Sequence, residues 1–205
     1  MAVFITFEGG DGSGKSTLLA RLEYALRNEE VSFLTTREPG GTPLGEKIRE
    51  LLIEETSPLA ELFLLEAARA EHVEKLIKPS LKKGVNVLCD RFTHSSMAYQ
   101  GAALGLKAEL VEKLNRIATA GLMPHATVWL RLPPEIAIER MQKRQISHRF
   151  DEKEISFHKK VFRAYEKLSK LEKKRFIVLN ATLTQDEIYE SLLAHPLWKQ
   201  LRKKM

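Results

Sequence analysis

The sequence predicts an α/β fold in which a five-stranded parallel sheet carries helices on both faces. Two observations support this prediction. Along the 205 residues, short apolar runs of strand length alternate with longer runs whose apolar residues recur every three or four positions. The first apolar run also leads directly into a glycine-rich turn and then a helical run. No internal repeat, low-complexity tract or linker interrupts the alternation, so we expect a single domain over residues 1–205.

Each predicted strand is a short, largely apolar run that ends at a polar or turn-forming residue. The first ends before a pair of glycines, the second before a turn at 37–42 that contains Pro39, and the third before Asp90. A parallel sheet is covered on both faces, which suits strands that are apolar throughout. The predicted strands are Val3–Phe7, Ser32–Thr36, Val85–Cys89, Thr127–Leu132 and Phe176–Leu179.

The predicted helices follow from periodicity and from their start signals. The first has Leu18, Leu22 and Leu26 on one face. Another begins after Pro133-Pro134, and proline suits the first turn of a helix. The predicted helices are Lys15–Arg27, Leu44–Ile53, Pro58–Leu81, Leu106–Ala120, Glu135–Arg144, Lys153–Lys173 and Asp186–Leu193.

Composition narrows the function classes. No apolar run approaches the length of a membrane span, and the start of the chain lacks a secretion signal, so we expect no membrane partner. The single cysteine, Cys89, forms no intrachain disulfide, and we expect a cytoplasmic protein. Between Arg140 and Arg175 there are 13 Lys/Arg against 5 Asp/Glu. Aromatic residues are not interleaved there as a stacking platform for nucleic acid requires, so a small polyanion is the expected partner.

The turn after the first strand is typical of a phosphate-binding loop. It fits the pattern GxxxxGK[ST] between a strand and a helix, which is the context that the pattern requires. The glycines allow backbone N–H groups to surround phosphate oxygens, and the positive end of the helix faces the same anion. Lys15 is expected to reach the β- and γ-phosphates, and the Ser16 hydroxyl to ligate Mg²⁺. The loop consists of Gly9, Gly10, Asp11, Gly12, Ser13, Gly14, Lys15 and Ser16. We therefore expect a nucleoside triphosphate as a ligand.

A second motif follows the third strand. Asp90 is placed beside the phosphate loop by an apolar strand, where an acidic residue handles the metal ion or its water shell. Arg91 comes next, and a guanidinium can grip a phosphate with two parallel hydrogen bonds.

These motifs together closely resemble the thymidylate kinase family. The resemblance rests on the phosphate loop, on TREPGGT at 36–42 and on DRF…S…AYQG at 90–101, and it covers essentially the whole chain. It implies a P-loop NTPase fold of five parallel strands with a mobile lid at about 140–152, usually assembled as a homodimer. It also implies transfer of the ATP γ-phosphoryl group to dTMP, giving dTDP and ADP, with Mg²⁺ as cofactor.

The resemblance implies roles for the residues around the phosphates. Lys15 and Ser16 keep the roles given above, and Thr17 also faces the ATP phosphates. Arg91 holds the dTMP phosphate with Arg49 as helper. Three further residues shape the acceptor side: Asp11 hydrogen-bonds the sugar near its 3′-hydroxyl, and Glu38 and Pro39 line the monophosphate site.

The family pattern also implies a site for the base. Arg69 donates to the thymine edge, and Ser95, Ser96 and Gln100 lie close to the base. Tyr99 presses on the sugar and disfavours a 2′-hydroxyl.

Two positions depart from the family pattern. An aromatic ring commonly stacks on thymine from the position occupied here by Leu65, so we expect a plain apolar contact and a base affinity weaker by about 1 kcal/mol. Phe63 is two residues away and points elsewhere on a helix. Gly12 stands where some members have an arginine. The members without it take the catalytic arginine from the lid, for which we expect Arg149 first, Arg144 second and Arg140 third.

Alternatives stay open at this stage. Arg69 and Arg49 are compatible with solvated surface residues, and Tyr99 with a plain core residue. The same fold also serves kinases of other nucleoside monophosphates or of nucleosides. A nucleic-acid-dependent NTPase is a further alternative, although the third strand lacks the paired acidic ending that activates water.

Overall fold

Five strands form one sheet in the order β2-β3-β1-β4-β5, and every neighbouring pair is parallel. The computed structural model describes residues 2–144 and 155–201. The predicted sheet is confirmed, and each predicted strand boundary lies within one residue of the observed one. The strands are β1 (Phe4–Glu8), β2 (Phe33–Arg37), β3 (Asn86–Asp90), β4 (Ala126–Arg131) and β5 (Phe176–Asn180).

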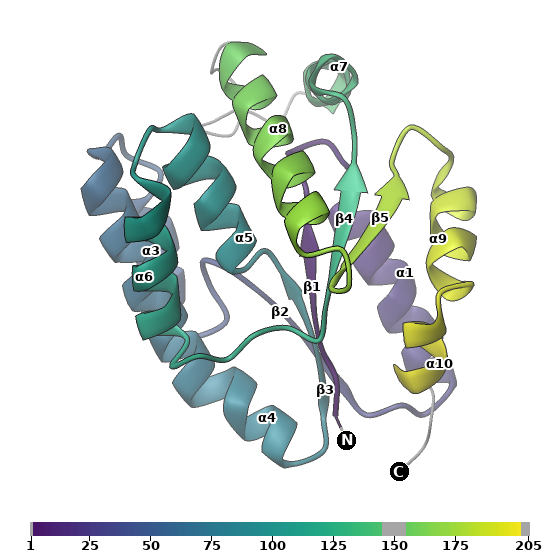
Figure 1. Cartoon of the computed structure of the whole chain (residues 1–205). Helices are drawn as coiled ribbons and strands as arrows, with labels where there is room; N and C mark the ends of the chain where they lie inside the picture. The colour runs from purple at the N-terminus through teal and green to yellow at the C-terminus, as the bar shows by residue number, and fades with distance from the viewer. Residues whose placement is uncertain (1, 145–154, 202–205) are drawn as a thin grey trace.

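The helices connect these strands and flank the sheet (Figure 1). The predicted helix at 58–81 is divided into α3, a π-helical stretch η1, and α4. The helix formed by α5 and η2 was not predicted, and neither was α10. The helical elements are α1 (Lys15–Asn28), α2 (Pro43–Leu51), α3 (Pro58–His72), η1 (Val73–Ile77), α4 (Lys78–Lys82), α5 (Thr93–Ser96), η2 (Met97–Ala103), α6 (Ala108–Ala118), α7 (Pro134–Arg144), α8 (Ile155–Leu171), α9 (Gln185–Leu193) and α10 (Pro196–Leu201).

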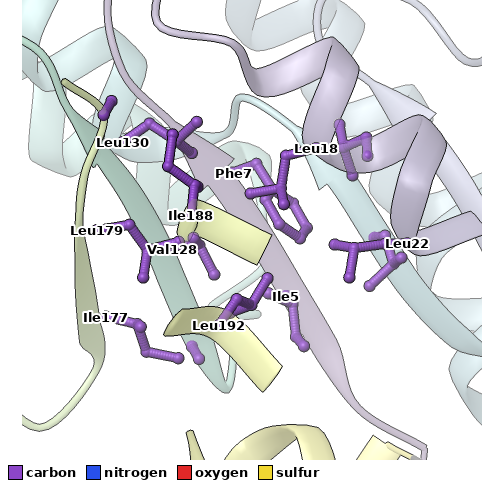
Figure 2. Close-up of a cluster of buried hydrophobic side chains, with 14 of the residues drawn as sticks. Ile5, Phe7, Leu18, Leu22, Val128, Leu130, Ile177, Leu179, Ile188 and Leu192 are labelled. Atoms are coloured by element: carbon purple, nitrogen blue, oxygen red, sulfur yellow. The ribbon is translucent and has the colours of Figure 1, made fainter. Parts of the chain in front are cut away.

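One face of the sheet packs against α1, α9 and α10, and Figure 2 shows the centre of this core. Ile5 and Phe7 of β1 contribute to it, as do Val128 and Leu130 of β4. Successive strand residues point to opposite faces, which is why alternate residues of one strand enter the same core.

The other face carries two smaller cores. One joins η1 and α4 to β1 and β3 through Phe4, Ile77 and Phe92. The other joins η2 and α8 to β4 and β5 around Trp129 and Tyr165. The predicted arrangement of helices on both faces is therefore confirmed.

The chain order places a switch point at β1. The chain passes from β1 to β2 and β3 on one side, then crosses to β4 and β5 on the other. In open parallel sheets of this kind ligands bind beyond the carboxyl ends of the strands at such a point. Among the described helices, none has both the length and the apolar character of a membrane span.

Candidate active site

A cavity of about 700 Å³ lies beyond the carboxyl ends of β1, β2 and β3. It brings together the phosphate loop, the turn after β2, one face of α3 and the start of the helix after β3. Most of the residues predicted for the site line it. They are Asp11, Gly12, Ser13, Gly14, Lys15, Ser16, Thr17, Glu38, Pro39, Arg49, Leu65, Arg69, Asp90, Arg91, Ser95, Ser96, Tyr99 and Gln100.

The phosphate loop connects β1 to the first turn of α1. Gly14 caps α1 with a left-handed backbone, φ 93°, which a residue with a side chain rarely adopts. Gly12 also has a positive φ of 75°, and a Cβ atom there would lie 2.9 Å from the carbonyl oxygen of Ala137 in α7. The close approach of α7 therefore leaves little space for a side chain at this position of the loop.

Lys15 is buried at the N-terminal end of α1. Its Nζ donates to the carbonyl oxygens of Gly9 at 3.0 Å and Gly10 at 3.3 Å. Burial lowers the pKa of Lys15, and the positive charge of Arg91 lowers it further. An anion in the loop would offset both effects, because it would supply the opposite charge that a buried ammonium requires.

Arg91 projects from the carboxyl end of β3 toward the phosphate loop. Its backbone has φ 69°, an uncommon conformation for a residue with a side chain. Its Nη2 donates to Asp11 Oδ1 at 2.6 Å, its Nη1 donates to Ser95 Oγ at 3.3 Å, and its guanidinium lies 5.0 Å from the centre of the Tyr99 ring. Burial opposes the charge of Arg91, but Tyr99 and Asp11 raise its pKa well above the ordinary value. Its charge is therefore fixed at all physiological pH values.

Two further arginines from the β2 side line the same cavity. Arg49 of α2 donates to the carbonyl oxygen of Pro39 at 3.1 Å, and Arg37 ends β2. Burial lowers the pKa of Arg49, and the like charges of Arg37 and Arg91 also lower it. Three cations that repel one another in one cavity form a site for an anion. Arg37 was not predicted, although its place at the carboxyl end of a strand was a signal.

Glu8 lies behind Arg91 at the end of β1 and is fully buried. Its carboxylate accepts from the Phe92 N–H at 2.8 Å, from Ser95 Oγ at 2.6 Å and from Tyr165 Oη at 2.7 Å. This carboxylate thereby joins β1, α5 and α8 beneath the site. Neither Glu8 nor Tyr165 was predicted for the site. Glu8 directly precedes the phosphate loop in the sequence, whereas Tyr165 is 157 residues away from it.

Arg69 is the central residue of a buried polar network and is 2% exposed. Its Nε donates to Glu38 Oε2 at 2.8 Å, and its Nη1 donates to Glu66 at 2.5 Å, to Ser96 at 3.1 Å and to Asn115 at 2.6 Å. Burial opposes its charge, but Glu38 and Glu66 raise the pKa of Arg69 above the ordinary value. The alternative that Arg69 is a solvated surface residue is wrong.

Glu38 is held on both carboxylate oxygens. Arg69 binds Oε2, and Nδ1 of the buried His72 lies 3.0 Å from Oε1. Nε2 of His72 lies 2.8 Å from Thr36 Oγ1. These bonds fix the turn at Glu38 and Pro39 against α3, which places its residues at the cavity.

Leu65 and Phe63 lie on different sides of α3. Leu65 is half-buried and lines the cavity, whereas the Phe63 side chain is exposed and does not line it. The expectation that Phe63 points elsewhere is confirmed. Tyr99 and Gln100 face the cavity from η2, although both are almost fully buried.

The proposed lid falls mainly outside the described residues. Arg149 is not described, and of Arg144 only its position in α7 is. Met141 of α7 lines the cavity and was not predicted.

The phosphate loop at the switch point and the opposing arginine cluster define a P-loop nucleotide kinase. The family model of thymidylate kinase matches residues 7–192, and the chain belongs to this family. Family membership makes it an ATP-dependent kinase that converts dTMP to dTDP for dTTP synthesis.

Similar proteins cover nearly the whole chain. A thymidylate kinase from Synechococcus sp. (strain JA-2-3B'a(2-13)) is 46% identical over 188 residues, which are 91% of this chain and 90% of that protein. One from Deinococcus radiodurans is 42% identical over 195 residues, covering 94% and 95%. The crystal structure of thymidylate kinase from Ehrlichia chaffeensis matches with a TM-score of 0.76 at 32% identity, covering 94% of this chain and 97% of that one.

Proposed function

We propose that the cavity binds both nucleotides at once, with the ATP phosphates on the phosphate loop and the dTMP phosphate on Arg91. This proposal rests on a contact between the donor side and the acceptor side of the cavity. Arg91 Nη2 donates to Asp11 Oδ1 of the phosphate loop at 2.6 Å. An anion held by Arg91 therefore lies next to an anion held by the loop. Such proximity is the main requirement of phosphoryl transfer.

On the donor side, backbone N–H groups from Gly9 to Ser16 surround the ATP phosphates. Lys15 exchanges its contacts with the Gly9 and Gly10 carbonyl oxygens for phosphate oxygens. Thr17, exposed in the first turn of α1, adds a hydroxyl. The positive end of α1 points at the same group.

On the acceptor side, Arg91 and Arg49 hold the dTMP phosphate, with Arg37 close by. A phosphate oxygen of dTMP is already anionic near neutral pH and attacks the γ-phosphorus directly. The bond from that phosphorus to the β-bridging oxygen breaks, and its electron pair leaves with ADP. No strong general base is needed, and the residues act by positioning and by neutralising charge.

The sugar and base of dTMP extend along α3 and η2. Asp11 accepts from the 3′-hydroxyl, and Tyr99 fills the space that a 2′-hydroxyl would need. Leu65 contacts the thymine face and Arg69 donates to its edge. Ser95 and Ser96 complete the wall beside the base, together with Gln100.

We propose Ser16 and Asp90 as the groups that hold Mg²⁺ or its water shell. Among the described residues, Asp90 Oδ1 is buried without a hydrogen-bond partner, and both residues line the cavity. Mg²⁺ uses oxygen ligands and commonly takes one or two from the protein and the rest from phosphates and water, so these donors fit. When bound, the ion neutralises charge on the β- and γ-phosphates.

Charge on the transferred group also requires a cation from the lid. We assign this role to Arg149, with Arg144 as the second choice. An arginine that reaches the γ-phosphate accelerates such reactions by about 10³ to 10⁵. Closure of a lid would also exclude the water that otherwise accepts the phosphoryl group.

We also propose a cytoplasmic homodimer. Apolar side chains are exposed on the neighbouring helices α3 and α6, and these side chains are Leu59, Phe63, Leu110 and Ile117. A second copy would cover them, and Phe63→Glu should convert the dimer to a monomer in light scattering. The one cysteine, Cys89, is buried, which suits a reducing compartment.

A substrate panel tests the reaction. Purified protein is incubated with ATP, Mg²⁺ and one of dTMP, dUMP, CMP, AMP or thymidine, and ADP release is followed. We expect dTMP to give the highest kcat/KM. A higher value with another acceptor would contradict the assignment of the base site.

A further inference from the structure

Glu61 is a buried acidic residue at the base end of the cavity, and the mechanism above gives it no role. It is 2% exposed and lines the cavity. It precedes Leu65 by four residues and Arg69 by eight on α3, so the three share one helix face. Gln100 of η2 also lines the cavity, and its Nε2 donates to Glu61 Oε1 at 2.6 Å.

This hydrogen bond fixes which way the Gln100 amide points. The amide nitrogen is the donor in this bond, so the NH₂ end of the Gln100 amide faces the Glu61 carboxyl group. The other end, Oε1, is an acceptor. Within the described part of the chain no hydrogen bond is made to that oxygen, although Gln100 itself is 3% exposed and lines the cavity.

Arg69 supplies a hydrogen-bond donor at the same end of the cavity. Its Nε and Nη1 are engaged by Glu38, Glu66, Ser96 and Asn115. No hydrogen bond within the described residues uses Nη2, and Arg69 lines the cavity. The base end of the cavity therefore offers a donor from α3 and an acceptor from η2.

We infer that Glu61 makes the site selective for bases with an imide edge, because it turns the Gln100 oxygen toward the base. Thymine and uracil present a C4 carbonyl oxygen, which accepts, next to N3–H, which donates. They match the Arg69 donor and the Gln100 acceptor. Cytosine presents an amino group and an unprotonated N3, so donor meets donor and acceptor meets acceptor. Sites built to hydrogen-bond a substrate group discriminate strongly in this way.

The inference rests on the proposed dTMP site, and the experiment separates the two. The kcat/KM values for dTMP, dUMP and dCMP are measured with the wild type, Glu61→Gln and Glu71→Gln. The carboxamide that Glu61→Gln introduces both donates and accepts, so Gln100 is no longer held in one orientation. We expect Glu61→Gln to lower the dTMP:dCMP ratio by about tenfold or more, the equivalent of one hydrogen bond. The dTMP:dUMP ratio should not change, because both bases carry the imide.

The control variant, Glu71→Gln on the same helix, should leave both ratios unchanged. A merely structural role of Glu61 would lower all three kcat/KM values together and leave the ratios constant, and that result would overturn the inference.

A pair of variants covers the case in which Glu61→Gln does not fold. The double variant Glu61→Gln/Gln100→Glu exchanges the two side chains, keeps one hydrogen bond between them and again presents an acceptor to N3–H. It should restore the wild-type dTMP:dCMP ratio, whereas Gln100→Met alone should abolish the preference. A normal preference in Gln100→Met would refute the inference while leaving dTMP kinase activity intact. A wild type that makes no dTDP from dTMP would remove the proposed site and this inference together.

Discussion

Replacing Arg91 with alanine tests the division of the cavity into donor and acceptor sites. In the structure Arg91 uses its two terminal nitrogens for Asp11 and Ser95. We expect both to bind the dTMP phosphate. A hydrogen bond to a charged group contributes about 1.5 to 3 kcal/mol, so two contribute about 3 to 6 kcal/mol. That loss corresponds to a decrease in kcat/KM for dTMP of about 10² to 10⁴.

Steady-state kinetics with varied dTMP and calorimetric titration of ATP measure the two sites separately. The ATP affinity of Arg91→Ala should stay close to that of the wild type, because Lys15 and the loop backbone remain in place. Arg27→Ala, on the surface at the end of α1, is the matched control and should keep normal kinetics. If Arg91→Ala loses ATP binding and keeps normal affinity for dTMP, the assignment of Arg91 is wrong.

Three further predictions concern Lys15, Leu65 and Glu46. Lys15→Ala should abolish dTDP formation and keep the circular-dichroism spectrum and cooperative melting of the wild type; residual turnover near the wild-type rate would exclude Lys15 from catalysis. Leu65→Phe should tighten dTMP binding by about 1 kcal/mol, or about fivefold, through ring stacking, and an unchanged dissociation constant would place another side chain over the base. Hydrogen bonds from the Gly41 N–H and from Arg37 lower the pKa of Glu46 below 4.5. The contribution of these hydrogen bonds to folding stability is therefore present above pH 4.5. It is lost as the pH falls through the lowered pKa of Glu46 in the folded state. The Tm of Glu46→Gln should be below that of the wild type at neutral pH, and the two should converge in acid; a gap of constant size would contradict this. The gap should reflect less than about 1 kcal/mol, because the pair is exposed.

The sheet could be predicted because its strands carry strong local signals. Each is a short, largely apolar run that ends at a polar residue or just before a turn, and the inner strands β1, β3 and β4 are buried along most of their length. The helix formed by α5 and η2 gave no such signal. It begins with Thr93 and His94, which are polar, yet both are buried against the sheet. Tertiary packing decided the conformation of this segment, and local propensity did not.

The residues of the candidate site also differ in how well the sequence predicts them. The phosphate loop and Arg91 are contiguous with strands that position them, so their chemistry is readable from short motifs. The surroundings of Arg69 are not, because its partners include Glu38, 31 residues before it, and Asn115, 46 residues after it. Long-range polar contacts of this kind produce no periodic pattern in the amino-acid sequence. The burial of Arg69 and of Glu61 became apparent only in the folded chain.

Rapid-quench measurement of a single turnover tests the central claim most directly. The protein is mixed with γ-labelled ATP, dTMP and Mg²⁺, and the label is followed. We expect it to move from ATP to dTDP in one step, with no free phosphate and no labelled protein. Label that appears first in inorganic phosphate, or no labelled dTDP at all, would contradict a cavity that aligns the two nucleotides for direct transfer.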